Sequence, residues 1–205
     1  MGIILSESST MITNDESEAK NKKEEEYIDY IKEHVNNVCT VFNNYFLAKS
    51  SQFAFEVLVN FTFFELESAI KELSKGRIYE HDNSKYSDEE FEPYRAKYFP
   101  TEKESTGLSD ESKSLIKKEY ELAWIHHYKN NPHHPKYWVD EESNIPRDMD
   151  LISIIEMICD WEAMSMKFNE STLDWYNNKA KDEKACMTDK TKNTVEEIMN
   201  IIFRK

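Results

Sequence analysis

The stretch DMDLISIIEMICDWEAMSMKF, residues 148–168, is the most informative part of the sequence for the fold. Its apolar residues recur at intervals of three and four, which is typical of an amphipathic helix that packs against a core. Glu156 and Asp160 are four residues apart, so they share one face of this helix with the apolar Ile152. No Lys or Arg precedes Lys167 in the stretch. We therefore predict a core helix that carries two carboxylates in a largely apolar direction.

These two carboxylates need a partner if their face of the helix is buried. An ionised carboxylate in apolar surroundings is costly, so it must be protonated, solvated or paired with a cation from elsewhere in the chain. A divalent metal ion would supply such a cation. The alternative is that this face is a solvent-exposed edge, with Met157, Ile158 and Trp161 forming the buried side. The sequence by itself leaves both arrangements open.

Helical patterns continue on both sides of this stretch. Apolar residues recur at helical spacing from Glu24 to Tyr45, and Ser87 with Glu90 resembles a capping box that would open a short helix. Further helices are predicted over residues 52–74, 110–130, 171–185 and 188–203. The chain has only three glycines and no run that alternates apolar and polar residues over strand length, which argues against hairpins and Gly-rich phosphate loops.

We therefore expect an all-α fold, a single bundle of about six to seven helices. Residues 1–22 mix Ser, Thr, Asn, Glu and Lys with little periodicity and are expected to form a flexible N-terminal tail. The folded domain is expected to span residues 23–205.

The charge and cysteine content narrow the class of protein. The chain has 205 residues with 26 Lys plus Arg and 40 Asp plus Glu, a formal net charge of −14. Affinity for nucleic-acid backbones comes mainly from clustered basic residues, so binding of duplex nucleic acid is not expected. No stretch approaches the roughly 18 consecutive apolar residues of a membrane span, so no membrane association is expected. Cys39, Cys159 and Cys186 fit neither a disulfide framework nor a thiolate zinc site, which predicts a cytoplasmic location.

Histidines are concentrated in one region of the chain. Of the six histidines, five fall between positions 81 and 134. They are His34, His81, His126, His127, His133 and His134. Imidazole and carboxylate are the usual ligands of zinc, iron, manganese, nickel and cobalt, so clustered His and Asp in an acidic chain indicate a metal site. The alternative for any single histidine is a surface position, or a core position in which hydrogen bonds satisfy the ring.

Two of these positions carry a more specific pattern. His34 lies on the apolar face of the helix predicted from Glu24. His81 and Asp82 are adjacent, and at a helix start or in a loop both side chains can turn towards the same cation. Lys85 follows three residues after Asp82, and on a helix that spacing would bring its ammonium group over the same site, where it could hold an anionic oxygen.

The order of these groups along the chain is H, HD, HH, HH and D. This order resembles the H…HD…D signature of the HD superfamily of metal-dependent phosphohydrolases, which are helical bundles whose two-metal members have additional histidines between HD and the last Asp. The segment HDNSK resembles the HDxGK box of cyclic-dinucleotide phosphodiesterases, with Ser84 in place of the glycine. Three blocks are also similar to uncharacterised HD-like proteins of bacteria and phages: HDNSKYSDEEF (81–91), AWIHHYKNNPHHPKYW (123–138) and IEMICDWEAMS (155–165).

The resemblance implies a set of metal ligands. It implies that a first metal is held by His34, His81, Asp82 and Asp160. It also implies that Asp82 bridges to a second metal, bound by one of His126 or His127 and by one of His133 or His134. The implied cofactor is one or two divalent transition-metal ions, of Mn, Fe, Ni, Co or Zn.

The resemblance also implies roles in the reaction. Metal-bound water would attack a phosphorus atom, and Lys85 would neutralise a phosphate oxygen. Glu156 would orient a ligand histidine or act as a general base. Lys129, Asn130 and Asn131 lie between the histidine pairs and would contact the substrate.

The favoured function is therefore a hydrolase that cleaves a phosphoester of a small phosphorylated substrate, a nucleotide or related metabolite. A di-iron oxygenase of the myo-inositol-oxygenase type is an alternative, because those proteins use the same order of ligands. A non-catalytic helical domain that binds a nucleotide or a protein is a further alternative. The sequence leaves the oligomeric state open, with a homodimer among the options.

Overall fold

The computed structural model describes residues 4–49, 53 and 58–203 and divides the chain into two compact units. The first unit consists of the chain up to Lys32 together with Ser84–His127. The second unit consists of Glu33–Asn83 and Tyr128–Lys205. The described residues form nine α-helices and no strand, which confirms the all-α class, although the helices are more numerous than the six to seven that the sequence predicts. One reason is that the helix predicted over 171–185 is interrupted, and forms α7 (Thr172–Asn178) and α8 (Lys181–Ala185).

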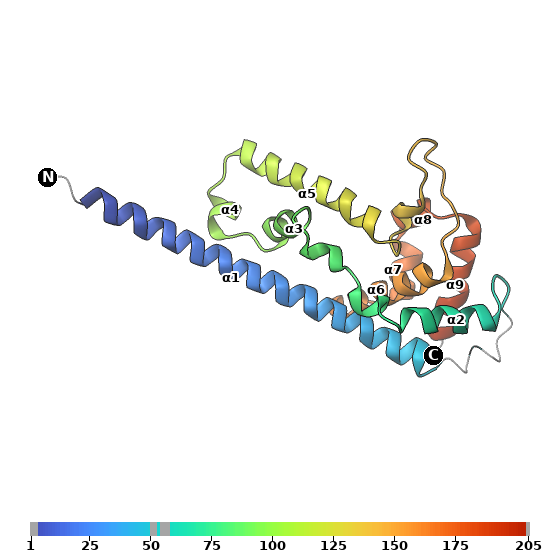
Figure 1. The fold of residues 1–205 in the computed structure, drawn as a ribbon. Helices are drawn as coiled ribbons and strands as arrows, with labels where there is room; N and C mark the ends of the chain where they lie inside the picture. Colours follow the sequence, from blue (N-terminus) through green and yellow to red (C-terminus); the bar gives the residue numbers. More distant parts are fainter. Residues whose placement is uncertain (1–3, 50–52, 54–57, 204–205) are drawn as a thin grey trace. The chain divides into compact units, whose positions relative to one another are not determined.

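Helix α1 (Ile4–Val41) is much longer than the sequence pattern predicts (Figure 1). Residues 4–22, which were expected to belong to a flexible tail, are helical. These residues lack an apolar stripe, but Glu and Lys are good helix formers, and the helix propagates from the amphipathic part that follows. The buried positions begin at Tyr27 and continue with Ile31, His34 and Val38, at the spacing of one helical face. The helix passes directly into a short π-helix, η1 (Phe42–Leu47).

The first unit is organised by aromatic contacts and a buried arginine. It contains α3 (Phe91–Tyr98), α4 (Glu102–Thr106) and most of α5 (Asp110–Asn130). The Tyr27 ring of α1 lies 5.2 Å from the Phe91 ring and 5.6 Å from the Phe99 ring. Arg95 of α3 is fully buried and its guanidinium group contacts both Glu92 and Glu104. Helix α5 has the bounds that the sequence predicts, because Pro132 cannot extend it.

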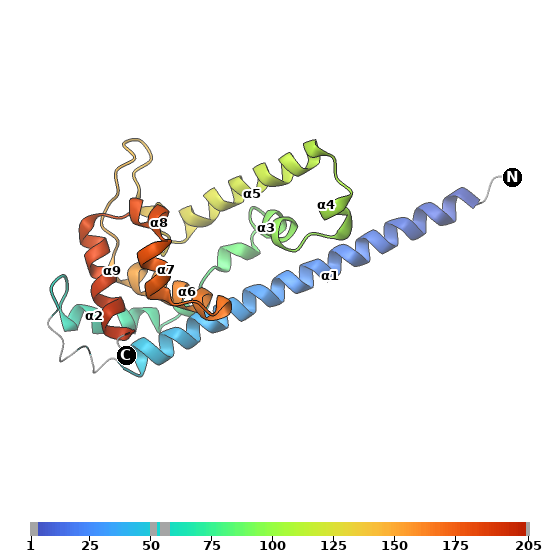
Figure 2. The ribbon, with the colours of Figure 1, turned by 180° about the vertical axis from the view of Figure 1, so that it is seen from behind.

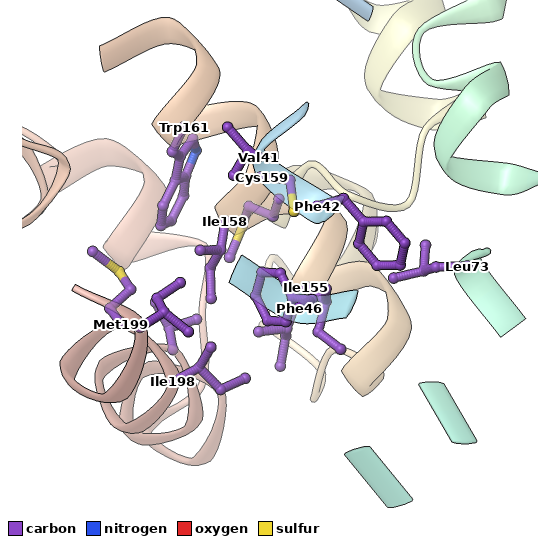
Figure 3. Close-up of a cluster of buried hydrophobic side chains, with 14 of the residues drawn as sticks. Val41, Phe42, Phe46, Leu73, Ile155, Ile158, Cys159, Trp161, Ile198 and Met199 are labelled. Atoms are coloured by element: carbon purple, nitrogen blue, oxygen red, sulfur yellow. The ribbon is translucent and has the colours of Figure 1, made fainter. Parts of the chain in front are cut away.

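The second unit is built around α6 (Leu151–Phe168). Helix α6 contacts α2 (Phe63–Leu73), α7 and α9 (Asp189–Ile202), and Figure 2 shows these elements together. Its buried apolar residues meet side chains from the end of α1, from η1 and from α9 (Figure 3). The labelled core residues are Val41, Phe42, Phe46, Leu73, Ile155, Ile158, Cys159, Trp161, Ile198 and Met199. The core helix predicted from residues 148–168 is therefore the central helix of this unit.

Helix α2 begins later than the sequence pattern predicts. The pattern predicts a start near residue 52, whereas the helix begins at Phe63. A capping box fixes this start: the Thr62 hydroxyl accepts a hydrogen bond from the Glu65 amide, and the Glu65 carboxylate accepts one from the Thr62 amide. Residues 52 and 54–57 of the predicted helix lie outside the described residues. No helix in the described part of the chain is long and apolar enough to cross a membrane.

Candidate metal centre

A sharp turn between two short 3-10 helices places the His81 and Asp82 side chains. The turn follows η3 (Arg77–Glu80) and precedes η4 (Asn83–Tyr86). His81 has an extended backbone, whereas Asp82 has a φ of 58°, in the left-handed region. This region is uncommon for residues other than glycine, but Asp and Asn tolerate it better than most. The turn allows the two adjacent side chains to face the same point, with His81 Nε2 3.7 Å from Asp82 Oδ2.

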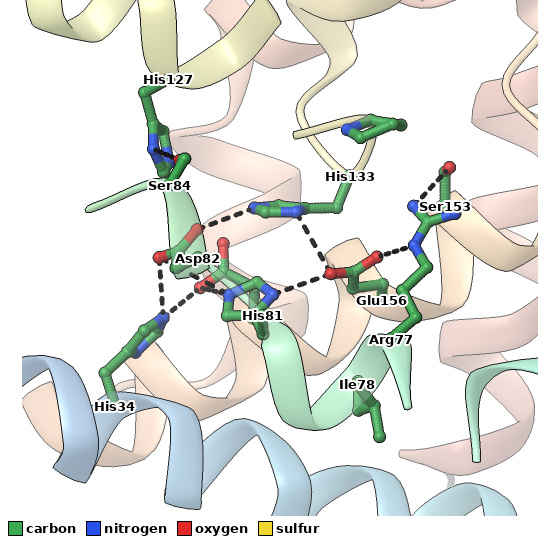
Figure 4. A network of polar contacts seen from close by, with 12 residues as sticks. His34, Arg77, Ile78, His81, Asp82, Ser84, His127, His133, Ser153 and Glu156 are labelled. Atoms are coloured by element: carbon green, nitrogen blue, oxygen red, sulfur yellow. Dashed lines mark hydrogen bonds and ion pairs between the residues drawn. The ribbon is translucent and has the colours of Figure 1, made fainter. Parts of the chain in front are cut away.

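His34 from α1 and Asp160 from α6 complete this group of side chains. His34 Nε2 lies 3.1 Å from Asp160 Oδ1 and 3.6 Å from Asp82 Oδ2. His81 Nε2 lies 3.8 Å from the same Asp160 oxygen. The side chains of His34, His81 and Asp82 are 6%, 0% and 3% exposed, so this is an interior cluster. Figure 4 shows His34, His81 and Asp82 turned towards one another. Residues that are far apart in the sequence therefore meet within the second unit.

His133 also reaches this cluster, from the segment that precedes η5 (Pro135–Trp138). Its Nε2 lies 3.4 Å from Asp82 Oδ1, and its ring centroid lies 4.3 Å from that of His81. The His134 ring is 4.2 Å from the His133 ring. The indole of Trp138 donates a hydrogen bond to the Pro132 carbonyl, and this bond helps to fix the loop that carries both histidines.

Glu156 lies behind the two imidazoles of His81 and His133 and is almost fully buried. Its Oε1 atom is 3.0 Å from His81 Nδ1 and 3.4 Å from His133 Nδ1. Its Oε2 atom accepts a hydrogen bond of 2.7 Å from Arg77 Nε, and Arg77 Nη2 donates to the Ser153 hydroxyl (Figure 4). The alternative of a solvent-exposed carboxylate face is therefore wrong for Glu156. The cation that this carboxylate needs comes from a residue 79 positions earlier, which no local pattern indicates.

The carboxylates and imidazoles of the cluster stabilise one another's charged forms. Burial alone would raise the pKa of Asp160, but the nearby imidazoles of His34 and His81 outweigh it and hold this pKa well below its usual range. Burial would also raise the pKa of Glu156, yet His133 and His81 lower it. Burial disfavours the charged form of His81, but the carboxylates of Asp82, Asp160 and Glu156 raise its pKa to about 10. The carboxylates of Asp82, Asp160 and Glu156 therefore stabilise positive charge within the cluster.

These side chains have the chemistry and spacing of a metal site. Bonds of about 2.1 Å to one ion would separate neighbouring ligand atoms by about 3.0–3.4 Å in octahedral or tetrahedral geometry. The histidine nitrogens of His34 and His81 lie 3.1 and 3.8 Å from Asp160 Oδ1 and 3.6 and 3.7 Å from Asp82 Oδ2, close to that range. His81 Nε2 is buried, points into the group and has no hydrogen-bond partner among the described residues. The buried His and Asp side chains could therefore hold a metal ion, and a modest contraction would complete the ligand set.

In the first unit, a different carboxylate holds His126 and His127. Glu90 Oε1 lies 2.7 Å from His126 Nδ1, and Glu90 Oε2 lies 2.7 Å from His127 Nδ1. The Ser84 hydroxyl is 3.3 Å from His127 Nδ1. Glu90 occupies the N-cap position of α3 but makes no side-chain capping bond, so the predicted capping box with Ser87 is wrong. The participation of His126 or His127 in a second metal site stays a prediction.

The residues that were predicted to contact substrate lie in other surroundings. Lys85 belongs to the first unit, where its ammonium group is 5.8 Å from the Tyr94 ring centroid. Lys129 forms an ion pair with Glu141 at 2.5 Å, and its side chain is half exposed. Asn131 is buried, and its carbonyl accepts a hydrogen bond from the His134 amide. The roles of these residues and of Asn130 in substrate binding stay predictions.

Sequence reasoning missed two residues that support the histidines, Arg77 and Glu90. Arg77 lies four residues before His81 and 79 residues before Glu156 in the sequence. Glu90 was interpreted as a helix cap because it lies three residues after Ser87. Ser153 lies three residues before Glu156 on the same face of α6 and accepts a hydrogen bond from Arg77. Its position beside Glu156 was the only local sign that this face has a polar partner.

Comparison with known proteins identifies a family but no characterised relative. No curated protein matches the chain, and no solved structure matches it. Residues 23–201 match a single family whose description is "Family of unknown function (DUF5662)". That match covers most of the chain and includes every residue of the buried cluster. The protein therefore belongs to the DUF5662 family.

Proposed function

We propose that this protein is a metal-dependent phosphohydrolase that cleaves a phosphoester of a small nucleotide or related metabolite. The observation that carries the proposal is the convergence of His34, His81, Asp82 and Asp160 at ligand-like separations in the interior of the second unit. The resemblance of these residues to the H…HD…D signature of the HD superfamily supports the choice of reaction.

Each residue of the cluster has a distinct task under this proposal. His34, His81, Asp82 and Asp160 would hold a divalent ion, which would supply an activated water and a Lewis acid for a phosphoryl group. Glu156 keeps His81 in the orientation in which Nε2 faces Asp82 and Asp160. The Asp82 carboxylate presents its second oxygen to His133, as a bridging ligand to a second ion would. Mn, Fe, Ni, Co and Zn all suit this set of nitrogen and oxygen donors.

The charge of the whole chain favours a small substrate. A formal charge of −14 repels an extended polyanion over a large surface. A mononucleotide or a sugar phosphate presents only a few charges, which a metal ion and one ammonium group can neutralise locally. Lys129, Asn130 and Asn131, which belong to the second unit, are the candidates for such contacts, and we expect alanine replacement of each to raise the KM.

The test begins with the metal. The protein is purified without a chelator or a His-tag, its metal content is measured by elemental analysis, and phosphate release is screened across nucleotides with that metal. We expect a transition metal at one or two ions per chain and hydrolysis of a small phosphoester. A protein that retains none of the five metals would contradict the proposal. Oxygen consumption by an iron-loaded protein without phosphate release would instead support the oxygenase.

Asp82→Asn is the variant that tests the site most directly. Asn tolerates the left-handed backbone of position 82 and keeps the shape of the side chain, but it removes the charge. We expect loss of bound metal and of phosphate release together. Asp182→Asn removes an exposed carboxylate from the same unit and is the matched control, which should leave both unchanged. Full activity in a metal-free Asp82→Asn protein would exclude the proposed mechanism.

A further inference from the structure

The chain uses one arrangement twice: a buried glutamate contacts two imidazoles through their Nδ1 atoms. In the second unit, Glu156 Oε1 lies 3.0 Å from His81 Nδ1 and 3.4 Å from His133 Nδ1. In the first unit, the two oxygens of Glu90 each lie 2.7 Å from one Nδ1 atom, of His126 and of His127. Glu90 is fully buried and Glu156 is 3% exposed. Four of the six histidines are therefore contacted at the same ring atom by a carboxylate.

This arrangement decides where the ring protons lie. An ionised carboxylate has only acceptor atoms, so a nitrogen that hydrogen-bonds to it must carry the proton. Arg77 Nε donates to Glu156 Oε2, and each oxygen of Glu90 lies 2.7 Å from one Nδ1 atom, so both buried glutamates are placed as acceptors of ring N–H groups. A neutral imidazole with its proton on Nδ1 has its lone pair on Nε2. In its neutral form, each of the four rings can therefore donate electrons through Nε2.

Arg77 determines the position of one of the two glutamates. Its Nε atom donates to Glu156 Oε2 at 2.7 Å, while the other carboxylate oxygen faces the two histidines. Its Nη2 atom donates to the Ser153 hydroxyl, one turn before Glu156 on α6. The planar guanidinium group therefore contacts α6 at two points, and this double contact fixes the plane of the carboxylate. A lysine ammonium group cannot reproduce both contacts in the same geometry.

We propose that Glu90 and Glu156 are positioning residues that impose the Nδ1–H form on four histidines, and that Arg77 positions Glu156. The part of this inference that concerns metal affinity rests on the proposed function, whereas the part that concerns ring protons does not. Neither glutamate binds the ion. Each acts through the imidazoles that it orients, and Arg77 acts through Glu156.

The first experiment observes the ring protons themselves. Two-bond proton–nitrogen correlation spectra of protein with ¹⁵N-labelled histidine separate protonated from unprotonated ring nitrogens. We expect His81, His126, His133 and His127 to carry a proton on Nδ1, in the metal-free and in the zinc-treated protein. Glu156→Gln should shift only the Nδ1–H signals of His81 and His133, and Glu90→Gln only those of His126 and His127. Each variant is therefore the control for the other.

The second experiment measures zinc affinity by calorimetry. Orienting residues of this kind typically contribute about 10–100-fold to metal affinity. We expect Arg77→Met to weaken zinc binding by about 10–100-fold, and Arg77→Lys to have an intermediate effect because it keeps the charge without the double contact. Arg147→Met, which removes an exposed arginine of the same unit, should leave the affinity unchanged. Circular dichroism checks that each variant is folded. If Arg77→Met does not fold, the zinc affinity of Arg77→Lys alone tests the role of Arg77.

The outcomes separate this inference from the proposed function. An unprotonated Nδ1 on any of the four rings, or glutamine variants that leave the signals of their own histidines unmoved, would overturn the assignment of the glutamates. Zinc affinity in Arg77→Lys equal to that of the wild type would overturn the assignment of Arg77. A wild-type protein with the expected ring protons that binds none of Mn, Fe, Ni, Co and Zn would overturn the hydrolase proposal and the role of Arg77, while the assignment of the glutamates would stand.

Discussion

At the scale of single residues, the left-handed backbone of Asp82 is the most consequential feature of the candidate site. A φ of 58° is costly for most side chains, and Asp is one of the few residues that adopt it readily. The same backbone turn brings the side chains of two adjacent residues, His81 and Asp82, to one point. Position 82 therefore needs a residue that both tolerates the turn and supplies a carboxylate. An alanine there would add backbone strain of about 1–2 kcal/mol to the loss of the ligand.

The Arg95 network of the first unit gives a prediction about pH. The hydrogen bond from Arg95 lowers the pKa of Glu104 to about 2, despite partial burial. A lowered pKa stabilises the folded protein above pH 4.5, and this contribution is lost as the pH falls through the folded-state value near 2. We expect Glu104→Gln to destabilise the protein by about 1–3 kcal/mol at pH 7. In urea unfolding, the difference between variant and wild type should shrink between pH 4.5 and 2.

A difference that is constant over that pH window would contradict the assignment of Glu104 as the partner of Arg95. Glu102→Gln is the matched control, because Glu102 lies in the same short helix but is exposed. It should change the urea midpoint little at either pH.

At the scale of secondary-structure elements, α6 has two faces with different tasks. One face carries the buried Ile155 and Ile158 of the core, and another carries Glu156 and Asp160 of the cluster. The packing of the apolar face therefore fixes the height and rotation at which the two carboxylates meet the histidines. Packing of the opposite face must hold such a helix firmly, because a shift of about one ångström would separate the carboxylates from the histidines.

Truncation of the apolar face gives a second prediction. Ile158 is fully buried, so Ile158→Ala should lower the free energy of unfolding by about 2–5 kcal/mol through lost burial and a cavity. Met166 lies on the same helix with 52% of its surface exposed, and Met166→Ala should change stability by no more than about 0.5 kcal/mol. Both values can be measured by urea denaturation. Equal effects of the two substitutions would show that α6 does not pack as described.

The bounds of the elements show how far local patterns reach. The start of α2 at Phe63 depends on the capping box of Thr62 and Glu65, which overrides the apolar run before it. The helical part of α1 before residue 23 has no apolar stripe, so a pattern that depends on burial cannot detect it. By contrast, α5 and the end of α6 agree with the predicted bounds, since proline after α5 and the left-handed Asn169 after α6 are local stop signals.

At the scale of the whole molecule, metal binding should be visible as a change in stability. A ligand that binds only the folded state at about one hundred times its Kd adds about 2.7 kcal/mol. For a chain of this size, that gain corresponds to a rise of roughly 5–10 °C in Tm. We therefore expect added zinc or manganese to raise the Tm and EDTA to reverse the rise, as measured by differential scanning calorimetry. Asp82→Asn should abolish the response, and an equal rise in that variant would place the metal elsewhere.

The sequence alone determined the fold class and the residue types of the site. Helical periodicity, scarce glycine and the absence of strand-like alternation are local properties, so they specify an all-α chain without any knowledge of contacts. The concentration of His and Asp likewise indicated metal chemistry before any geometry was known.

Only the tertiary structure decided which of these residues meet. The convergence of His34, His81, Asp82 and Asp160 depends on the packing of α1, α6 and the turn after η3, which lie far apart in the chain. The pairing of Arg77 with Glu156 has the same origin. Burial of apolar surface elsewhere on these segments brings their polar side chains together. The spacing of the polar residues in the sequence does not reveal that burial, so it does not predict which of them meet.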